Sequence, residues 1–194
     1  MTILIPFAGL IPAPWKNGGG SSTEIAIEPP GATLHNFEWR LSLATISHSG
    51  PFSTFAGVDR TLALVDGPGF TLDIDGERHI LLDIDNGAIS FAGEAAACAT
   101  LHDAPTVDFN VMTRRDVCQH KLGRRHVDGS AQYAPGGQRS ILFLAAGAAW
   151  AAYYFLVLAG RTDTDNAYVG GNLVTVSSQV AGSVIDSFAE GGGD

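Results

Sequence analysis

Residues 14–20 combine side chains and backbone groups that could hold a small polar ligand. They form the sequence Pro-Trp-Lys-Asn-Gly-Gly-Gly. Successive glycines let backbone N–H groups approach a ligand without obstruction by side chains. An indole, an amine and an amide beside them suit an anionic or polar ligand better than a hydrophobic core. The residues that this interpretation assigns to the ligand are Trp15, Lys16, Asn17, Gly18 and Gly19. A flexible turn between two strands is the alternative, because glycine-rich loops are common.

Arg40 is a candidate for binding a carboxylate. Arg40 and Ser42 occupy alternate positions of a segment in which polar and apolar residues alternate. If the polar face lines the inside of a barrel, the guanidinium of Arg40 can bind a carboxylate through two parallel hydrogen bonds. Ser42, on the same face, could donate its hydroxyl. The alternative is a structural ion pair between Arg40 and Glu24 or Asp59.

Arg60 and Asn110 are further candidates for ligand binding. Arg60 directly follows Asp59, so a nearby carboxylate is its alternative partner. Asn110 shares a face of its predicted strand with Asp108 and Met112. That face either contacts the ligand through Asn110 or forms an inward polar network that braces the sheet.

Glu24 and Phe55 complete the candidate site. Glu24 follows the glycine run and could brace it, with its carboxylate close to Lys16. Phe55 ends the loop-like segment 51–55, which contains two phenylalanines. This segment could cover the mouth of a pocket or plug the hydrophobic core.

Short strands must position these residues. Alternation of polar and apolar residues and frequent turn signals predict an all-β sandwich or barrel, and no long amphipathic helix pattern occurs. The predicted strands are 37–43, 60–65, 70–74, 79–84, 106–113, 172–177 and 183–188. Turns are predicted at Asp66-Gly67-Pro68-Gly69, Asp75-Gly76 and Asn86-Gly87. The pattern is irregular near 121–137, which could link two halves.

Composition limits the kinds of partner. The 194 residues are 45% hydrophobic and 16% charged, with a net charge of −9. This composition is typical of a globular protein and argues against a nucleic-acid partner, which would favour a basic surface. The two cysteines, Cys98 and Cys118, form no disulfide framework and fit a reducing, cytoplasmic compartment.

Residues 140–160 are uncharged and long enough to cross a bilayer. Their aromatic residues lie near the centre of the segment, whereas aromatic residues in membranes prefer the interfaces. We therefore expect no membrane partner. We expect the segment to form two buried strands, 140–145 and 152–159, joined by a turn around Gly147.

Several motifs resemble the HutD/Ves family, and their order and spacing are kept from Pro14 to Arg115. The motifs are Trp15-Lys16-Asn17-Gly18-Gly19-Gly20 with Thr23-Glu24-Ile25-Ala26, Phe37-Glu38-Trp39-Arg40-Leu41-Ser42, Gly50-Pro51-Phe52-Ser53-Thr54-Phe55, Gly57-Val58-Asp59-Arg60 and Asp108-Phe109-Asn110-Val111-Met112-Thr113-Arg114-Arg115. The C-terminal half resembles the family only in general terms.

The resemblance implies an all-β bicupin, two small RmlC-like jelly-roll barrels packed as one body. We expect a single unit over 1–194, with an N-terminal barrel at 1–115 and a C-terminal barrel at 116–190. The resemblance also implies a role in regulating histidine utilisation, through binding of a small acidic metabolite such as formylglutamate. A homodimer is left open.

No metal or other cofactor is expected. Many cupins bind metals through a His-x-His motif, and none of the six histidines forms one. Cys118, His120 and His126 are the best alternative ligand set, but the positive charge around them disfavours a cation. The basic segment 114–126 is either a charged edge strand or a surface for an anion or a partner.

Two other functional classes stay open. An enzyme, a lyase or a hydrolase acting on the same kind of metabolite, could use Glu24 or Asp59. The sequence offers little support for nucleophilic catalysis, because it contains neither a Gly-x-Ser-x-Gly elbow nor a P-loop. A protein-interaction module without a ligand is the third class.

Overall fold

The computed structural model describes residues 5–127, 130–133, 139–146, 168–170, 173–177 and 182–191, with side chains over 5–126 and 140–144. The elements in these ranges are β-strands apart from the 3-10 helix η1 (Phe7–Gly9). The predicted all-β class is therefore confirmed. Within the described residues, no helix is long and apolar enough to cross a membrane.

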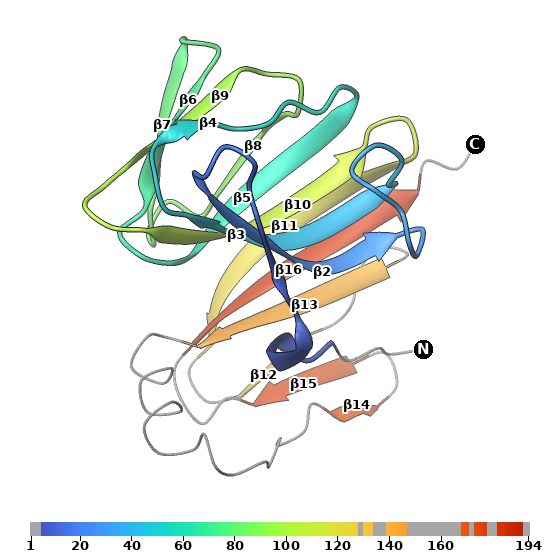
Figure 1. Ribbon diagram of the computed structural model, residues 1–194. Helices are drawn as coiled ribbons and strands as arrows, with labels where there is room; N and C mark the ends of the chain where they lie inside the picture. Colours follow the sequence, from blue (N-terminus) through green and yellow to red (C-terminus); the bar gives the residue numbers. More distant parts are fainter. Residues whose placement is uncertain are drawn as a thin grey trace.

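A six-stranded antiparallel sheet, the central sheet, organises the molecule (Figure 1). Its strand order is β1-β2-β3-β10-β5-β8. In that order the strands are β1 (Pro12–Pro14), β2 (Gly20–Glu28), β3 (Trp39–Ile46), β10 (Thr106–Arg114), β5 (Val58–Asp66) and β8 (Ala88–Ala92). β10 therefore pairs with strands that lie far from it in the sequence.

A four-stranded sheet packs on one face of the central sheet. Its strands, in the order β4-β9-β6-β7, are β4 (Gly50–Pro51), β9 (Ala97–Leu101), β6 (Phe70–Ile74) and β7 (Arg78–Leu82). A hydrophobic core lies between the two sheets, with Leu62, Leu64 and Ile89 from the central sheet against Phe70 and Leu72.

A C-terminal sheet packs on the opposite face (Figure 1). Its strands, in the order β11-β16-β13, are β11 (Cys118–Val127), β16 (Gly182–Gly191) and β13 (Arg139–Ala146). Phe109 of β10 stacks on Phe143 of β13 with ring centroids 4.9 Å apart. A further small sheet has the order β12-β15-β14, with β12 (Ser130–Tyr133), β15 (Leu173–Ser177) and β14 (Tyr168–Gly170).

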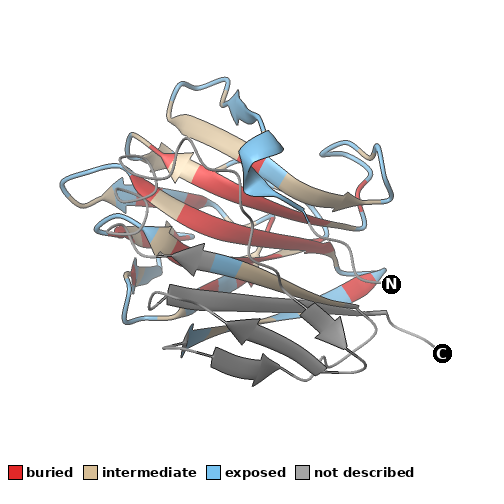
Figure 2. Cartoon of the chain, turned by 90° about the horizontal axis from the view of Figure 1, so that it is seen from below, coloured by how far each residue is buried: buried red, intermediate tan, exposed pale blue. Residues whose placement is uncertain are grey.

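Both faces of the inner strands of the central sheet are covered. Buried positions are consecutive along much of β3, β5 and β10 rather than alternating with exposed ones (Figure 2). Even the polar positions Arg40, Ser42 and Asn110 are buried. A polar face that is buried in this way can form a site inside the protein.

The predicted strands differ from the observed ones mainly at their ends, but eight observed strands were not predicted: β1, β2, β4, β8, β9, β11, β12 and β14. β6 and the Asp75-Gly76 hairpin match the prediction, and both turn residues have positive φ, 58° and 72°. The irregular segment 121–137 is in part regular, because β11 pairs with β16 from Cys118 to Val127. The expected irregularity is therefore wrong for 121–127 and 130–133, while the link between two halves stays a prediction.

The uncharged segment 140–160 is described only in part. Its first predicted strand lies within β13, whose residues Ile141 and Phe143 pack against the core beneath the central sheet. The second predicted strand, 152–159, lies outside the described residues. The division into barrels at 1–115 and 116–190 stays a prediction.

Candidate functional site

The glycine-rich segment forms a tight turn between β1 and β2. The amide of Trp15 donates to the carbonyl of Gly20 at 2.8 Å, and the amide of Gly18 donates to the carbonyl of Trp15 at 3.0 Å. The amide of Gly19 donates to Oδ1 of Asn17 at 3.0 Å. Two of the three glycine amides are therefore already bonded within the turn.

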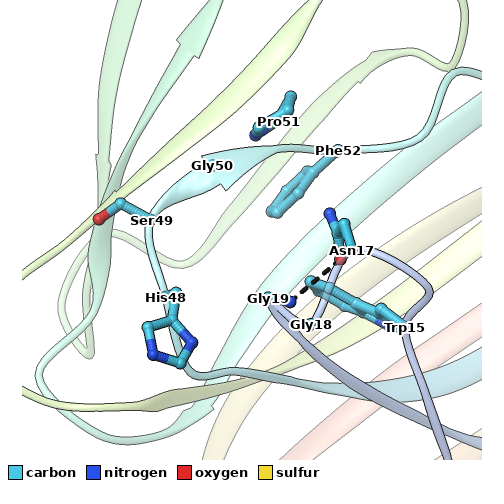
Figure 3. A pocket seen from close by; sticks show the side chains of 9 residues that line it. All are labelled: Trp15, Asn17, Gly18, Gly19, His48, Ser49, Gly50, Pro51 and Phe52. Carbon is cyan, nitrogen blue, oxygen red and sulfur yellow. Dashed lines mark hydrogen bonds between the residues drawn. The ribbon is translucent and has the colours of Figure 1, made fainter.

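This turn borders an open hollow of about 440 Å³ (Figure 3). We call it the outer hollow. Its lining residues are Trp15, Asn17, Gly18, Gly19, His48, Ser49, Gly50, Pro51 and Phe52. The amides of Ser47 and His48 both donate to the carbonyl of Gly19, which joins the two walls. Lys16, itself a described residue, is exposed and is not part of this lining.

A second group of polar residues is buried between the central and the four-stranded sheets. Arg40, Ser42, Arg60, Asp108 and Asn110 are each at most 8% exposed. Asn110 pairs across strands with Ser42 and Leu62, and Leu62 belongs to the core beneath the four-stranded sheet. Directly paired residues and every second residue share a face of a sheet, so these side chains project into that same space. We call them the inner polar cluster.

Arg60 is a buried cation surrounded by aromatic rings. Its Cζ atom lies 5.1 Å from the ring centroid of Phe91, 5.5 Å from that of Phe52 and 5.6 Å from that of Phe55. Its Nη1 donates to the carbonyl of Ser53 at 3.2 Å, whereas its buried Nε has no partner among the described residues. Burial lowers the pKa of Arg60 to about 10, so the group stays protonated at neutral pH.

Arg40 is held by side chains of its own sheet. Its Nε donates to Oε2 of Glu24 at 2.9 Å, and its Nη1 donates to Oγ of Ser42 at 3.0 Å. Glu24 is 45% exposed at its side chain, so this ion pair connects the inner polar cluster with solvent. The alternative of a structural ion pair with Glu24 is thus present, while Asp59 instead pairs with Arg115 at 2.8 Å.

Asp108 and Asn110 carry buried acceptors without partners. Both carboxylate oxygens of Asp108 and Oδ1 of Asn110 lack a hydrogen bond to any described residue. Burial raises the pKa of Asp108 to about 7, and the nearby charge of Arg60 opposes this shift. Because most buried polar groups in proteins are hydrogen-bonded, these atoms mark a place where a partner is missing.

Phe52 links the outer hollow to the inner polar cluster. It lines the hollow, packs edge-on against Trp15 with centroids 6.3 Å apart, and contacts Arg60 from the other side. Figure 3 shows its ring pointing toward Trp15 and Asn17. Segment 51–55 was expected either to cover the mouth of a pocket or to plug the hydrophobic core. Phe52 of this segment does both, because it lines the hollow and also packs against the core.

The family of this chain follows from a match over most of its length. The HutD family model matches residues 9–158. The chain belongs to the HutD family.

Two similar proteins are from bacteria. An uncharacterized 21.2 kDa protein in the hutC 3' region of Pseudomonas putida is 37% identical over 68% of this chain and 67% of its own length. Protein Ves of Citrobacter koseri is 37% identical, and the match covers 56% of either chain. The chain therefore spans only about half the length of Ves.

Solved structures with a similar fold cover nearly the whole chain. HutD from Pseudomonas fluorescens SBW25, solved in a formate condition, has a TM-score of 0.66 with 27% identity and covers 96% of this chain and 97% of its own. A conserved protein of unknown function from Pseudomonas aeruginosa PAO1 has a TM-score of 0.73 with 22% identity over 97% and 98% of the two chains, a likeness of fold alone.

The predicted site residues of this HutD-family chain fall into two neighbouring groups. Trp15, Asn17, Gly18 and Gly19 border the outer hollow, and Arg40, Ser42, Arg60 and Asn110 lie in the inner polar cluster. Glu24 and Phe55 contact the arginines of that cluster. Asp108 and Phe52 were not among the predicted ligand contacts, although the two-residue spacing between Asp108 and Asn110 was a usable signal.

The alternative metal ligands do not form a cluster. Within the described residues, no group of three or more His, Cys, Asp and Glu side chains could hold a metal ion. His120 is occupied on both ring nitrogens, with Nδ1 2.8 Å from Oγ1 of Thr113 and Nε2 2.7 Å from Oγ1 of Thr61. Burial lowers the pKa of His120, which favours the neutral ring.

Much of the basic segment is bound to the protein itself. Arg114 donates to the carbonyls of Phe37 and His35, and Arg115 pairs with Asp59 and Glu94. These arginines join the end of β10 to loops and to β5. They are therefore less available to a separate anion than their sequence suggests.

Proposed function

We propose that this HutD-family protein binds a small acidic metabolite of histidine utilisation in the inner polar cluster, and thereby takes part in regulating that pathway. Formylglutamate is the ligand we put first. The family match supports the proposal, as does the relative in the hutC 3' region of Pseudomonas putida. We further propose a bicupin architecture and a cytoplasmic location, and leave a homodimer open.

One observation carries the ligand class. Arg60 is 6% exposed, yet the part of the chain that the structure describes supplies its side chain with one hydrogen bond, to the carbonyl of Ser53. A buried cation is costly unless an anion or hydrogen-bond acceptor compensates it. A ligand carboxylate would supply such a partner, and the rings of Phe52, Phe55 and Phe91 would exclude water from the pair.

Calorimetric titration of the Arg60→Gln variant tests this assignment. We expect wild-type protein to bind N-formylglutamate and the variant to lose about 2–4 kcal/mol of binding free energy, the usual cost of truncating one partner of a buried charge pair. Arg115→Gln is the matched control, because Arg115 forms exposed ion pairs outside the cluster. Equal affinity of Arg60→Gln and wild type would exclude Arg60 from the site.

A thermal-shift screen separates binding from turnover. The compounds are histidine, urocanate, formiminoglutamate, formylglutamate and glutamate. A ligand of the folded state adds about 2.7 kcal/mol of stability at a hundredfold excess over its dissociation constant. Each compound that raises Tm is then incubated with the protein, and its consumption would favour the enzyme over the binding protein.

A further inference from the structure

Among the fully buried atoms of the inner polar cluster, acceptors without a partner outnumber donors without one. Within the described part of the chain, the fully buried acceptors without partners are Oδ1 and Oδ2 of Asp108 and Oδ1 of Asn110, whereas the fully buried donor without one is Nε of Arg60. Such atoms are costly to bury because they lose their hydrogen bonds to water and gain none in the protein. A ligand that brings only carboxylates would satisfy Arg60 and leave these oxygens without partners.

The two side chains directly opposite Asp108 cannot donate to it. Asp108 lies directly between Ala44 of β3 and Leu64 of β5, both of which have apolar side chains. Next along the strand, Asn110 lies between Ser42 and Leu62, and no hydrogen bond from Ser42 to either acceptor occurs among the described residues. The two acceptor side chains therefore face the same interior space from neighbouring positions of one strand face.

We propose that Asp108 and Asn110 form a subsite for an N–H group of the ligand, so that the bound molecule pairs a carboxylate with Arg60 and a nitrogen donor with Asp108. This inference rests on the proposed function and narrows its ligand class. The class is short carboxylic acids that carry an amide, amidine or ammonium nitrogen. Simple dicarboxylates such as glutarate lack this donor.

Two ligands that differ in one group test the inference. N-formylglutamate has an N–H group where its ester analogue, 2-formyloxyglutarate, has an oxygen. We expect calorimetric titration of wild-type protein to give a Kd about 5- to 150-fold lower for the N–H compound, because the ester leaves a buried acceptor without a donor. Glutarate should bind at least as weakly as the ester.

Variants of Asp108 test whether this residue causes the preference for the N–H ligand over the ester. In Asp108→Leu the side chain cannot accept, so we expect the two ligands to bind with nearly equal affinity. Asp108→Asn keeps one acceptor oxygen and should retain part of the preference. Asp116→Asn is the control, because Asp116 is exposed in the turn between β10 and β11, and it should retain the full preference. Thermal denaturation checks that each variant is folded.

The outcomes separate the inference from the proposed function. If wild-type protein binds both ligands equally, the N–H subsite is wrong, whereas the acidic-ligand function stands. If Asp108→Leu keeps the full preference, Asp108 is not the discriminating residue and the inference fails. If no ligand binds to the wild-type protein, the proposed function fails and the inference fails with it.

Discussion

Arg60 and Asp108 are oppositely charged side chains that share an interior and yet are not bonded to each other. Each remains at most 6% exposed, and each has buried atoms without a partner among the described residues. Their mutual attraction opposes the pKa shift that burial causes in either group. This arrangement sacrifices folding stability, as binding sites often do.

Asp108 should make the protein less stable as the pH rises. Its pKa is raised from 3.8 to about 7 by burial, so between these values the folded state holds a proton that the unfolded state has released. The free energy of unfolding then falls by up to about 1.4 kcal/mol per pH unit. Arg60, whose charge opposes the shift of Asp108, stays protonated throughout this range because its pKa is about 10.

Urea unfolding of wild type and Asp108→Asn between pH 4 and 8 measures this effect. The variant has no titratable side chain at position 108. The free energy of unfolding of the variant, relative to that of wild type, should therefore rise toward pH 7 and level off above it. A constant difference between the two proteins at every pH would contradict the raised pKa.

Arg40 should affect both binding and stability. Arg40→Ala removes a buried guanidinium beside the proposed ligand, which we expect to cost about 2–4 kcal/mol of binding free energy. It also removes the bonds to Glu24 and Ser42, so Tm should fall as well. Arg40→Lys should recover part of the affinity, because lysine lacks the two-pronged guanidinium.

Glu24→Gln is the companion variant for Arg40, since it removes the ion pair and keeps the guanidinium. Calorimetry and thermal denaturation are run on the same samples. Unchanged affinity together with a lower Tm in Arg40→Ala would assign Arg40 to the scaffold alone.

The types of the site residues could be predicted, but not all of their partners. Arg40, Ser42 and Asn110 alternate with apolar residues, and alternation places side chains on one face of a strand. The aromatic contacts of Arg60 depend on Phe52 and Phe91, which are brought together by loop and sheet packing over long sequence distances. No local pattern encodes such contacts.

At the scale of elements, the turn before β2 is fixed by a close approach of two backbones. An added Cβ at Gly20 would lie 2.1 Å from the carbonyl oxygen of Thr45 in β3, and a backbone atom cannot move aside cheaply. Three consecutive glycines suggested an open cradle for a ligand. For Gly20 the structure provides another reason, which is the packing of its strand against β3.

Gly20→Ala should therefore lower the free energy of unfolding by about 1–3 kcal/mol, the usual cost of overpacking. Gly123→Ala in β11 is the matched control, because no atom of the described residues lies within 4 Å of its added Cβ. That variant should be neutral or slightly stabilising, since alanine restricts the unfolded chain. Urea unfolding compares the two, and equal stabilities would exclude the clash.

β11 shows which elements local pattern misses. Its residues include five basic or histidine side chains and a glycine, so its sequence lacks the apolar alternation of a strand. It is ordered by pairing with β16 along its whole length and by its buried His120. Local pattern was sufficient for β6, whose buried and half-buried positions alternate regularly.

At the scale of the whole molecule, the central sheet contributes to two hydrophobic cores. Leu62 and Leu64 face the four-stranded sheet, while Phe109 and Val111 face the C-terminal sheet. The all-β class could be predicted from short strands and turns. The strand order could not, because β10 pairs with β3 and β5, and these pairings depend on packing between distant segments.

Phe109→Ala tests how much the second core contributes. Phe109 is fully buried and stacks on Phe143, so we expect a loss of about 3–5 kcal/mol in the free energy of unfolding. Leu81→Ala is the control, because Leu81 is 40% exposed and should cost far less. Urea unfolding monitors both, and a small loss in Phe109→Ala would show that the C-terminal sheet adds little stability.

Side chains along β10 alternate between the inner polar cluster and the hydrophobic core on the opposite face. This alternation determines which mutations the strand can accept. A point mutation at codon 108 or 110 alters the chemistry of the inner polar cluster and leaves the opposite core intact. Deletion of one codon within the strand would turn Phe109 toward the cluster and Asn110 toward the hydrophobic core. Substitutions in β10 can therefore change the ligand preference of this protein, whereas a change in the length of β10 would disrupt both of its faces.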